Sequence, residues 1–188
     1  MEIILASASP RRREILENAG IRFKVCPADV DETTDKTEPS EYVTELAKRK
    51  AEALDCGRNI IVAADTVVAT GSEILGKPRD DGDAARMLTL LSGKAHQVYT
   101  AVSVRSKDKS VTFCEKTDVY FKELTKEQID WYIKTGEPRD KAGAYAIQGK
   151  GAVFIKKIDG DYLNVIGLPL SRLYDVLHKN FEGFDKNE

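Results

Sequence analysis

The chain of 188 residues is 41% apolar and 32% charged, and its formal net charge is −2. These values are typical of a soluble globular protein with a substantial core. The balanced charge excludes a general basic field, so nucleic acid is not an expected partner. No apolar run approaches the ~20 residues of a membrane span, and the N-terminus lacks the layout of a signal peptide, so no membrane is expected as a partner.

The cysteines and histidines narrow the chemistry further. Cys26, Cys56 and Cys114 show no CxxC spacing, and we expect reduced thiols in a cytoplasmic protein. His96 and His178 are the two histidines, which excludes a histidine-rich metal site and disfavours a Ser-His-Asp mechanism.

The N-terminal residues have the layout of a phosphate site. Met1–Ala6 is apolar and predicts a strand, Ser9 suits a helix N-cap, and Pro10 suits the first helical position. Free N–H groups and the positive end of a helix dipole meet at such a turn. Arg11–Arg13 would lie in the first helical turn, where the dipole disfavours unpaired cations, so an anion is expected beside them. The alternative is an ordinary basic helix start on the surface.

A helix is predicted from Pro39 to Leu54, after an acidic, threonine-rich loop at residues 30–40. Lys50 falls on the inward face of this helix. An inward ammonium needs a partner or a wet cleft, or else it reaches past the edge of the core. The helix alone leaves these alternatives open. The apolar face consists of Val43, Leu46, Ala47, Ala51 and Leu54.

Asn59–Thr70 predicts a strand buried on both faces, and Asp65 interrupts it. A carboxylate there is costly unless it is paired or binds a metal, although a structural aspartate that bonds a loop is the alternative. Gly71-Ser72 predicts a turn into a second strand, Glu73–Pro78. With a two-residue turn, Lys77 would face Thr66 and lie one step from Asp65.

The rest of the chain predicts helices and hairpins rather than an all-parallel sheet. A helix is expected from Asp80 to Gly93, and the capping box of Thr125 with Gln128 begins another. Lys141–Gly151 is rich in small residues, which permit close backbone approach to a ligand. The other expected elements are a hairpin of Val98–Arg105 with Val111–Phe121 around Ser106–Lys109, a hairpin of Ala152–Ile158 with Tyr162–Ile166, a final helix with Leu170, Leu173, Tyr174 and Leu177 inward, and a frayed tail from about residue 182.

Together these residues favour metal-assisted chemistry on a nucleotide or another polyphosphate. Glu32 and Asp65 suit a divalent cation of the magnesium type, and Lys50 and Lys77 suit the charge of phosphoryl groups. The GxxxxGK[ST], GxGxxG and HExxH motifs are absent. The residues alone leave the base and the cleaved bond open.

Several blocks, in order along nearly the whole chain, resemble the Maf family of nucleoside triphosphate pyrophosphatases. The blocks are Leu5-Ala6-Ser7-Ala8-Ser9-Pro10-Arg11-Arg12, Asp31-Glu32, Leu46-Ala47-Lys48-Arg49-Lys50-Ala51, Ala64-Asp65-Thr66-Val67-Val68, Gly76-Lys77-Pro78, Lys141–Gly151 and Gly167-Leu168-Pro169.

The resemblance implies a mixed, strongly twisted α/β sheet with flanking helices, in a single domain (residues 1–188) with two lobes around a central cleft. It also implies a homodimer and the hydrolysis of a nucleoside triphosphate between the α and β phosphates, with Mg²⁺ or Mn²⁺. Asp65 matches the general base, although a base and a metal ligand are different roles and Asp65 suits either. Glu32 matches an acidic position that shares the metal. The other matching positions around the triphosphate are Ser7, Ser9, Arg12, Lys50 and Lys77.

Three further positions resemble the branch of the family that acts on dTTP and UTP. Arg11, Thr66 and Gln148 match this branch, whereas the branch that prefers 7-methyl-GTP resembles Trp, Gln and Glu there. A glutamine amide both donates to and accepts from a pyrimidine edge. Modified pyrimidine triphosphates would fit a house-cleaning role. The alternatives are a nucleotide-binding regulator of cell division with little turnover, the same hydrolase acting on purine triphosphates, and a nucleic-acid-binding domain.

Overall fold

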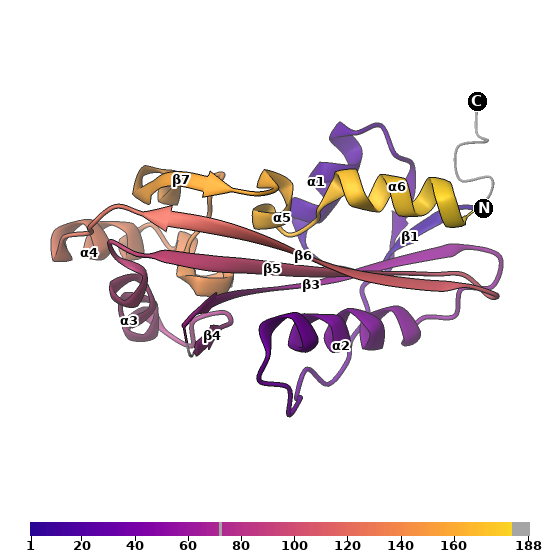
Figure 1. Ribbon diagram of the computed structural model, residues 1–188, viewed down its shortest axis with the longest axis horizontal. Coiled ribbons are helices and arrows are strands. Elements are labelled where there is room, and N and C mark those ends of the chain that lie inside the picture. Colours follow the sequence, from indigo (N-terminus) through magenta and orange to yellow (C-terminus); the bar gives the residue numbers. More distant parts are fainter. Residues whose placement is uncertain (72, 182–188) are drawn as a thin grey trace. The chain divides into compact units, whose positions relative to one another are not determined.

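The computed structural model describes residues 1–71 and 73–181 of the chain and contains a seven-stranded mixed sheet (Figure 1). The strand order is β2-β1-β3-β5-β6-β7, and β4 pairs with β3 beside this path. The strands are β1 (Ile3–Leu5), β2 (Phe23–Val25), β3 (Ile60–Thr70), β4 (Glu73–Leu75), β5 (Ala95–Arg105), β6 (Ser110–Phe121) and β7 (Ile155–Asp159).

Six α-helices occur in the described ranges, together with three short 3₁₀ helices. The α-helices are α1 (Pro10–Asn18), α2 (Pro39–Glu52), α3 (Asp81–Leu91), α4 (Lys126–Lys134), α5 (Tyr162–Ile166) and α6 (Leu170–Asn180). The 3₁₀ helices are η1 (Glu137–Asp140), η2 (Ala142–Ala144) and η3 (Lys150–Phe154). Strands paired both parallel and antiparallel, with helices between them, confirm the predicted mixed α/β class.

The chain divides into two compact units. Unit 1 comprises residues 1–65, 100–115 and 167–188, and unit 2 comprises residues 66–99 and 116–166. The strands β3, β5 and β6 contribute residues to both units. The single domain with two lobes around a cleft stays a prediction.

Unit 1 is built on β1, which pairs in parallel with β2 on one side and with β3 on the other. Helix α2 buries its apolar face, as its spacing predicts, and Arg105 on β5 donates to the Ala51 and Leu54 carbonyls at the C-terminal end of this helix. The two bonds from Arg105 satisfy carbonyls that the end of the helix leaves open. Elsewhere in unit 1, Arg172 on α6 donates to the Cys114 carbonyl on β6.

Unit 2 has its own apolar core. Helix α3 buries Ala84, Met87, Leu88 and Leu91 along one face, and helix α4 begins with the predicted capping box of Thr125 and Gln128. Both helices pack against aromatic residues of the sheet and of the 3₁₀ segments. The core residues include Val68, Met87, Leu88, Leu91, Phe121, Tyr132, Tyr145 and Phe154.

Most predicted local features are confirmed. Ser9 is the N-cap residue of α1 and Pro10 follows it, and the Ser106 N–H donates to the Lys109 carbonyl in the turn between β5 and β6. Thr70 pairs with Glu73, which is the register of a two-residue turn. Ser72 lies outside the described residues. The ladder ends at Leu75, so Lys77 lies beyond it instead of in a strand that reaches Pro78, and it has no strand partner in the described chain.

Three predictions about local structure were wrong in whole or in part, and one strand was not predicted. Tyr162–Ile166 forms helix α5 instead of a strand, because the Asp161 carboxylate accepts the Leu163 N–H at 2.7 Å and begins a helical turn. Strand β7 begins at Ile155 instead of at the predicted Ala152, since residues 152–154 belong to η3, and it pairs with β6. Tyr174 on α6 is 45% exposed, not inward. Strand β2 has no periodicity that predicts it, because only three residues take part. The predicted frayed tail from residue 182 lies outside the described residues.

Helices that could cross a bilayer are absent from residues 1–71 and 73–181. Cys26 is exposed, Cys114 is partly buried and Cys56 is buried, and none of the three forms a disulfide.

Candidate functional site

Three of the predicted site residues meet in unit 1 around one ammonium group. The Lys50 Nζ atom lies 2.6 Å from Asp65 Oδ1 and 2.6 Å from Glu32 Oε1. The Lys50 and Asp65 side chains are 13% and 12% exposed, whereas the Glu32 side chain is 61% exposed. The inward lysine of α2 therefore pairs with the carboxylate that interrupts β3, and the acidic loop supplies a second carboxylate from the solvent side.

The charges around Asp65 act on its pKa in opposite directions. Burial raises the pKa of this carboxyl, while the Lys50 ammonium and the Arg12 guanidinium lower it and the Glu32 carboxylate raises it. Burial dominates, so the pKa lies above its ordinary value. A carboxylate with a raised pKa is a better proton acceptor than an exposed aspartate.

Arg49 holds the loop that carries Glu32 against helix α2. The Arg49 Nη1 atom donates to the carbonyl of Asp31 at 3.0 Å and to the carbonyl of Thr33 at 2.6 Å, one on each side of Glu32. Its Nη2 atom bonds Glu45 one turn earlier on α2. Lys50 follows Arg49 directly, so one helical turn both orients the loop and supplies the cation that its carboxylate meets.

The N-terminal turn is organised around Ser7 and Arg12. The Ser7 hydroxyl oxygen accepts the Arg12 Nη1–H at 2.9 Å and the Ser9 N–H at 3.3 Å, and Arg12 Nε donates to the Gly167 carbonyl at 2.8 Å. The Ser9 side chain does not cap helix α1. Burial lowers the pKa of Arg12, and the negative charge of Asp65 opposes this effect. Arg11 is half-buried in the same first turn, which carries no acidic residue.

Lys77 and Gln148 belong to unit 2, and Thr66 is its first residue. Thr66 directly follows Asp65 along β3, so the two side chains point to opposite faces of the strand. Lys77 and Gln148 are exposed. The segments that carry them are joined, because the Gly143 N–H donates to the Gly76 carbonyl at 3.0 Å.

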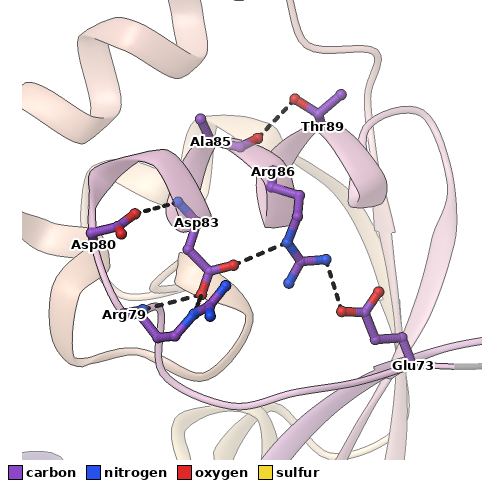
Figure 2. Close-up of polar contacts among 7 residues, drawn as sticks. All are labelled: Glu73, Arg79, Asp80, Asp83, Ala85, Arg86 and Thr89. Carbon is purple, nitrogen blue, oxygen red and sulfur yellow. Dashed lines mark hydrogen bonds and ion pairs between the residues drawn. The ribbon is translucent and has the colours of Figure 1, made fainter.

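A network of charged side chains brackets the Gly76-Lys77-Pro78 segment. Figure 2 shows the buried Asp83 carboxylate between Arg79 and Arg86, and Arg86 Nη1 reaching Glu73 on β4 at 2.7 Å. The Asp80 carboxylate accepts the Asp83 N–H and caps α3. The network connects the strand before Lys77 with the helix after it, which fixes both ends of the short segment.

A cavity of about 570 Å³ adjoins this segment and is lined by Pro78–Gly82 and Arg139. Arg139 bonds Asp81 at 3.3 Å, and Arg79 bonds Asp83. Both cations that line the cavity therefore pair with carboxylates, and Asp80 and Asp81 add negative charge to its lining.

Comparison with known proteins identifies the family of the chain. A family model described as Maf-like protein matches residues 2–180. The chain belongs to the Maf-like family. A protein of Bacillus cereus named dTTP/UTP pyrophosphatase is 53% identical over 175 residues, which cover 92% of each chain. A protein of Bacillus cytotoxicus with the same name is 53% identical over 184 residues, or 96% of each chain, and one of Bacillus anthracis is 52% identical over 175 residues.

The carboxylates of this Maf-like chain fit a divalent ion only in part. Glu32 and Asp65 are two carboxylates on one ammonium, and the described residues contain no group of three or more His, Cys, Asp or Glu that could hold a metal. Two carboxylates suit Mg²⁺, which usually takes its other ligands from water and substrate phosphates. Lys50 lies between them, so an ion at these two oxygens would compete with its Nζ atom.

Sequence reasoning missed several residues that shape the site of this Maf-like protein. The apolar spacing of α2 leaves Arg49 outside the inward face, and no helical periodicity shows that its side chain reaches carbonyls on the preceding loop. The capping box predicts the start of α4, but it does not indicate that the Tyr132 hydroxyl donates to Glu137 and accepts from the Ala146 N–H. Hydrogen bonds between such segments have no sequence period.

Proposed function

We propose that this chain hydrolyses dTTP and UTP, together with modified pyrimidine triphosphates, to the nucleoside monophosphate and pyrophosphate. The observation that carries the proposal is the buried Asp65 carboxylate, which lies 2.6 Å from the ammonium of Lys50 in a protein of the Maf-like family. The names of the Bacillus relatives, 52–53% identical over nearly the whole chain, support the choice of substrate.

In this proposal Asp65 accepts a proton from a water molecule. The water oxygen forms a bond to the α-phosphorus, and the bond from that phosphorus to the α–β bridging oxygen breaks. Pyrophosphate leaves with the electron pair of that bond. The raised pKa of Asp65 suits proton transfer from water near neutral pH better than that of an exposed carboxyl.

The cations and hydroxyls of the N-terminal turn are assigned to the triphosphate. Arg12 is held by Ser7 and by the Gly167 carbonyl, so its guanidinium needs little reorganisation to meet phosphate oxygens. The same basic, hydroxyl-rich helix start also includes Arg11, Ser7 and Ser9. Lys77, in unit 2, is assigned to neutralise negative charge on the phosphates.

Lys50 keeps the two carboxylates paired while no substrate is bound. Glu32 and Asp65 are the residues that would hold Mg²⁺ or Mn²⁺, and such an ion supplies charge neutralisation for the phosphates. On this assignment Lys50 gives up a carboxylate contact and its ammonium turns to the leaving pyrophosphate. The metal, the homodimer and the cytoplasmic location all stay predictions.

We assign Thr66 and Gln148 to binding of the nucleobase. A glutamine amide offers one donor and one acceptor, which is what the edge of uracil or thymine requires. Within residues 1–71 and 73–181 the Gln148 side chain forms no hydrogen bond or ion pair, so its amide is available to a ligand.

Product analysis on a panel of nucleoside triphosphates, with Mg²⁺ and with Mn²⁺, tests the proposal. We expect pyrophosphate and monophosphate from dTTP and UTP, and a loss of at least about a hundredfold in kcat for Asp65→Asn. Asp55→Asn makes the same chemical change at an exposed carboxylate that caps a turn, and should keep full turnover. Release of orthophosphate would show that a bond other than the one between the α and β phosphates is cleaved. Nucleotide binding without turnover would favour a regulator, and a preference for purines would contradict the base assignment.

A further inference from the structure

The segment that carries Gln148 is held on both sides by two side chains of unit 2. Before Gln148, the Ala146 N–H donates to the Tyr132 hydroxyl at 3.0 Å. After it, the Lys150 N–H and the Gly151 N–H donate to the two carboxylate oxygens of Glu137 at 3.0 and 3.1 Å. We call residues 146–151 the Gln148 loop.

Tyr132 and Glu137 are hydrogen-bonded to each other as well as to the Gln148 loop. The Tyr132 hydroxyl donates to Glu137 Oε1 at 2.8 Å while it accepts from Ala146, so a continuous chain of bonds closes the Gln148 loop. Burial opposes ionisation of Glu137, but the Lys150 N–H, the Tyr132 hydroxyl and the Gly151 N–H outweigh it and lower the pKa of this carboxyl. Burial and the charged neighbour both raise the pKa of Tyr132, which keeps its proton.

The glycines of the loop are required by this contact. A Cβ atom on Gly149 would overlap the Glu137 carboxylate, and one on Gly151 would lie 2.7 Å from the Tyr132 hydroxyl oxygen. The backbone can therefore approach the two side chains only because both positions lack a side chain. Ile147, Gln148 and Gly149 are left between the two anchored ends.

The loop is anchored further upstream by a buried ring contact. His96 Nε2 lies 2.9 Å from the Tyr145 hydroxyl oxygen, and His96 is 0% exposed. Gly143 and Ala144 before it both take positive φ, at 66° and 59°. Each of these contacts restrains backbone that leads into Gln148, whereas none restrains the amide of Gln148 itself.

We propose that Tyr132 and Glu137 are positioning residues that set the base preference, because they fix the backbone on both sides of Gln148. The inference rests on the proposed function, in which Gln148 binds the pyrimidine edge. A site that hydrogen-bonds a base discriminates by geometry, so a loop free to move would present the amide less accurately and would accept other bases. Tyr132 and Glu137 act through the loop and need no contact with substrate.

Tyr132→Phe is the first test, because it removes the hydroxyl but keeps the ring that packs against Phe154 at 5.0 Å between centroids. We expect KM for dTTP and UTP to rise about tenfold, with a smaller change in kcat, and the preference for dTTP over GTP in kcat/KM to fall by a similar factor. Asp130→Asn, which breaks an exposed pair with Lys126 on the same helix, is the matched control and should leave both parameters unchanged.

A double-mutant cycle separates positioning from a general structural role. In a Gln148→Ala background, Tyr132→Phe should cause no further loss of preference, because the amide that the loop presents is gone. If Tyr132→Phe lowers the preference equally in both backgrounds, or not at all in the wild-type background, the inference is overturned.

Glu137→Gln provides an independent variant. The NH₂ group of its amide would face the Lys150 or the Gly151 N–H, donor against donor, so one hydrogen bond to the loop is lost. Hydrogen exchange should accelerate at the amides of Ala146, Lys150 and Gly151 in either variant, while the exchange of strand β3 stays at the wild-type rate. Wild-type protein that fails to hydrolyse dTTP or UTP would overturn the proposed function. Wild-type hydrolysis with unchanged preference in both variants would overturn this inference alone.

Discussion

Replacing Gly143 with alanine tests how closely the segment before Gln148 packs against the sheet. Gly143 takes φ of +66°, where an L-residue costs about 1–2 kcal/mol. A Cβ atom there would also lie 2.8 Å from Cγ2 and 2.9 Å from Cβ of Val68, a buried residue of β3 that cannot turn away freely. Overpacking of this kind costs about 1–3 kcal/mol. We therefore expect Gly143→Ala to lower the free energy of unfolding by about 2–5 kcal/mol.

Gly136→Ala is the matched control, because Gly136 has φ of +73° and a Cβ atom added there would meet no other atom within 4 Å. Gly136→Ala should lower the free energy of unfolding only by the cost of the backbone conformation, about 1–2 kcal/mol. Urea unfolding at equilibrium measures both, provided that the m-value stays constant. Val68→Ala removes two of the three Val68 atoms that Gly143→Ala would meet, Cγ1 and Cγ2, and keeps Cβ. Part of the overlap is relieved, so the double variant should be less destabilised than the sum of the single variants. Equal losses for Gly143→Ala and Gly136→Ala, or strict additivity with Val68→Ala, would refute the steric reasoning.

Three further outcomes are expected. Burial raises the pKa of Asp65 and Lys50 lowers it, with burial dominant, so the acid limb of kcat/KM should lie at a higher pH than that of an exposed carboxyl. Lys50→Met should move this limb to a still higher pH, and a shift to lower pH would contradict the assignment. Arg49→Ala should raise the Mg²⁺ concentration for half-maximal activity about tenfold through loss of the Glu32 loop, with Lys48→Ala as the unaffected neighbour. Burial lowers the pKa of His96 to about 4, so the unfolded state binds the extra proton below pH 6.5 and the free energy of unfolding should fall by about 3 kcal/mol between pH 6.5 and 4. His96→Gln should flatten that slope, measured by urea unfolding across the range.

The pair of Lys50 and Asp65 shows what sequence reasoning could predict. Each residue interrupts an otherwise apolar buried surface, so each needed a partner, and the partner of each proved to be the other. Neither pattern identified that partner alone. The alternative for Lys50, a side chain that reaches past the core edge, differs only in tertiary contacts that helical periodicity does not contain.

The misassigned helix α5 shows where local patterns fail. Tyr162–Ile166 is rich in apolar and β-branched residues and favours a strand by propensity. The Asp161 carboxylate begins a helical turn, and the buried Asn164 amide donates to the Thr117 hydroxyl and to the Val98 carbonyl. Those two acceptors lie 47 and 66 positions away along the chain, so no window of local sequence contains them. The closure of the Gln148 loop by Tyr132 and Glu137 escaped prediction for a different reason: the partners lie 5 to 14 positions apart, but these hydrogen bonds follow no sequence period.

The bond from Arg12 to the Gly167 carbonyl has a consequence for synthesis on the ribosome. The two residues are 155 positions apart, and unit 1 combines the first 65 residues with residues that follow unit 2. The turn that carries Arg12 leaves the exit tunnel before Gly167, so its arginine gains this acceptor only after residue 167 has emerged. Unit 2 is therefore translated before unit 1 is complete, and in a nascent chain stalled before that point the Arg12 side chain still lacks this carbonyl.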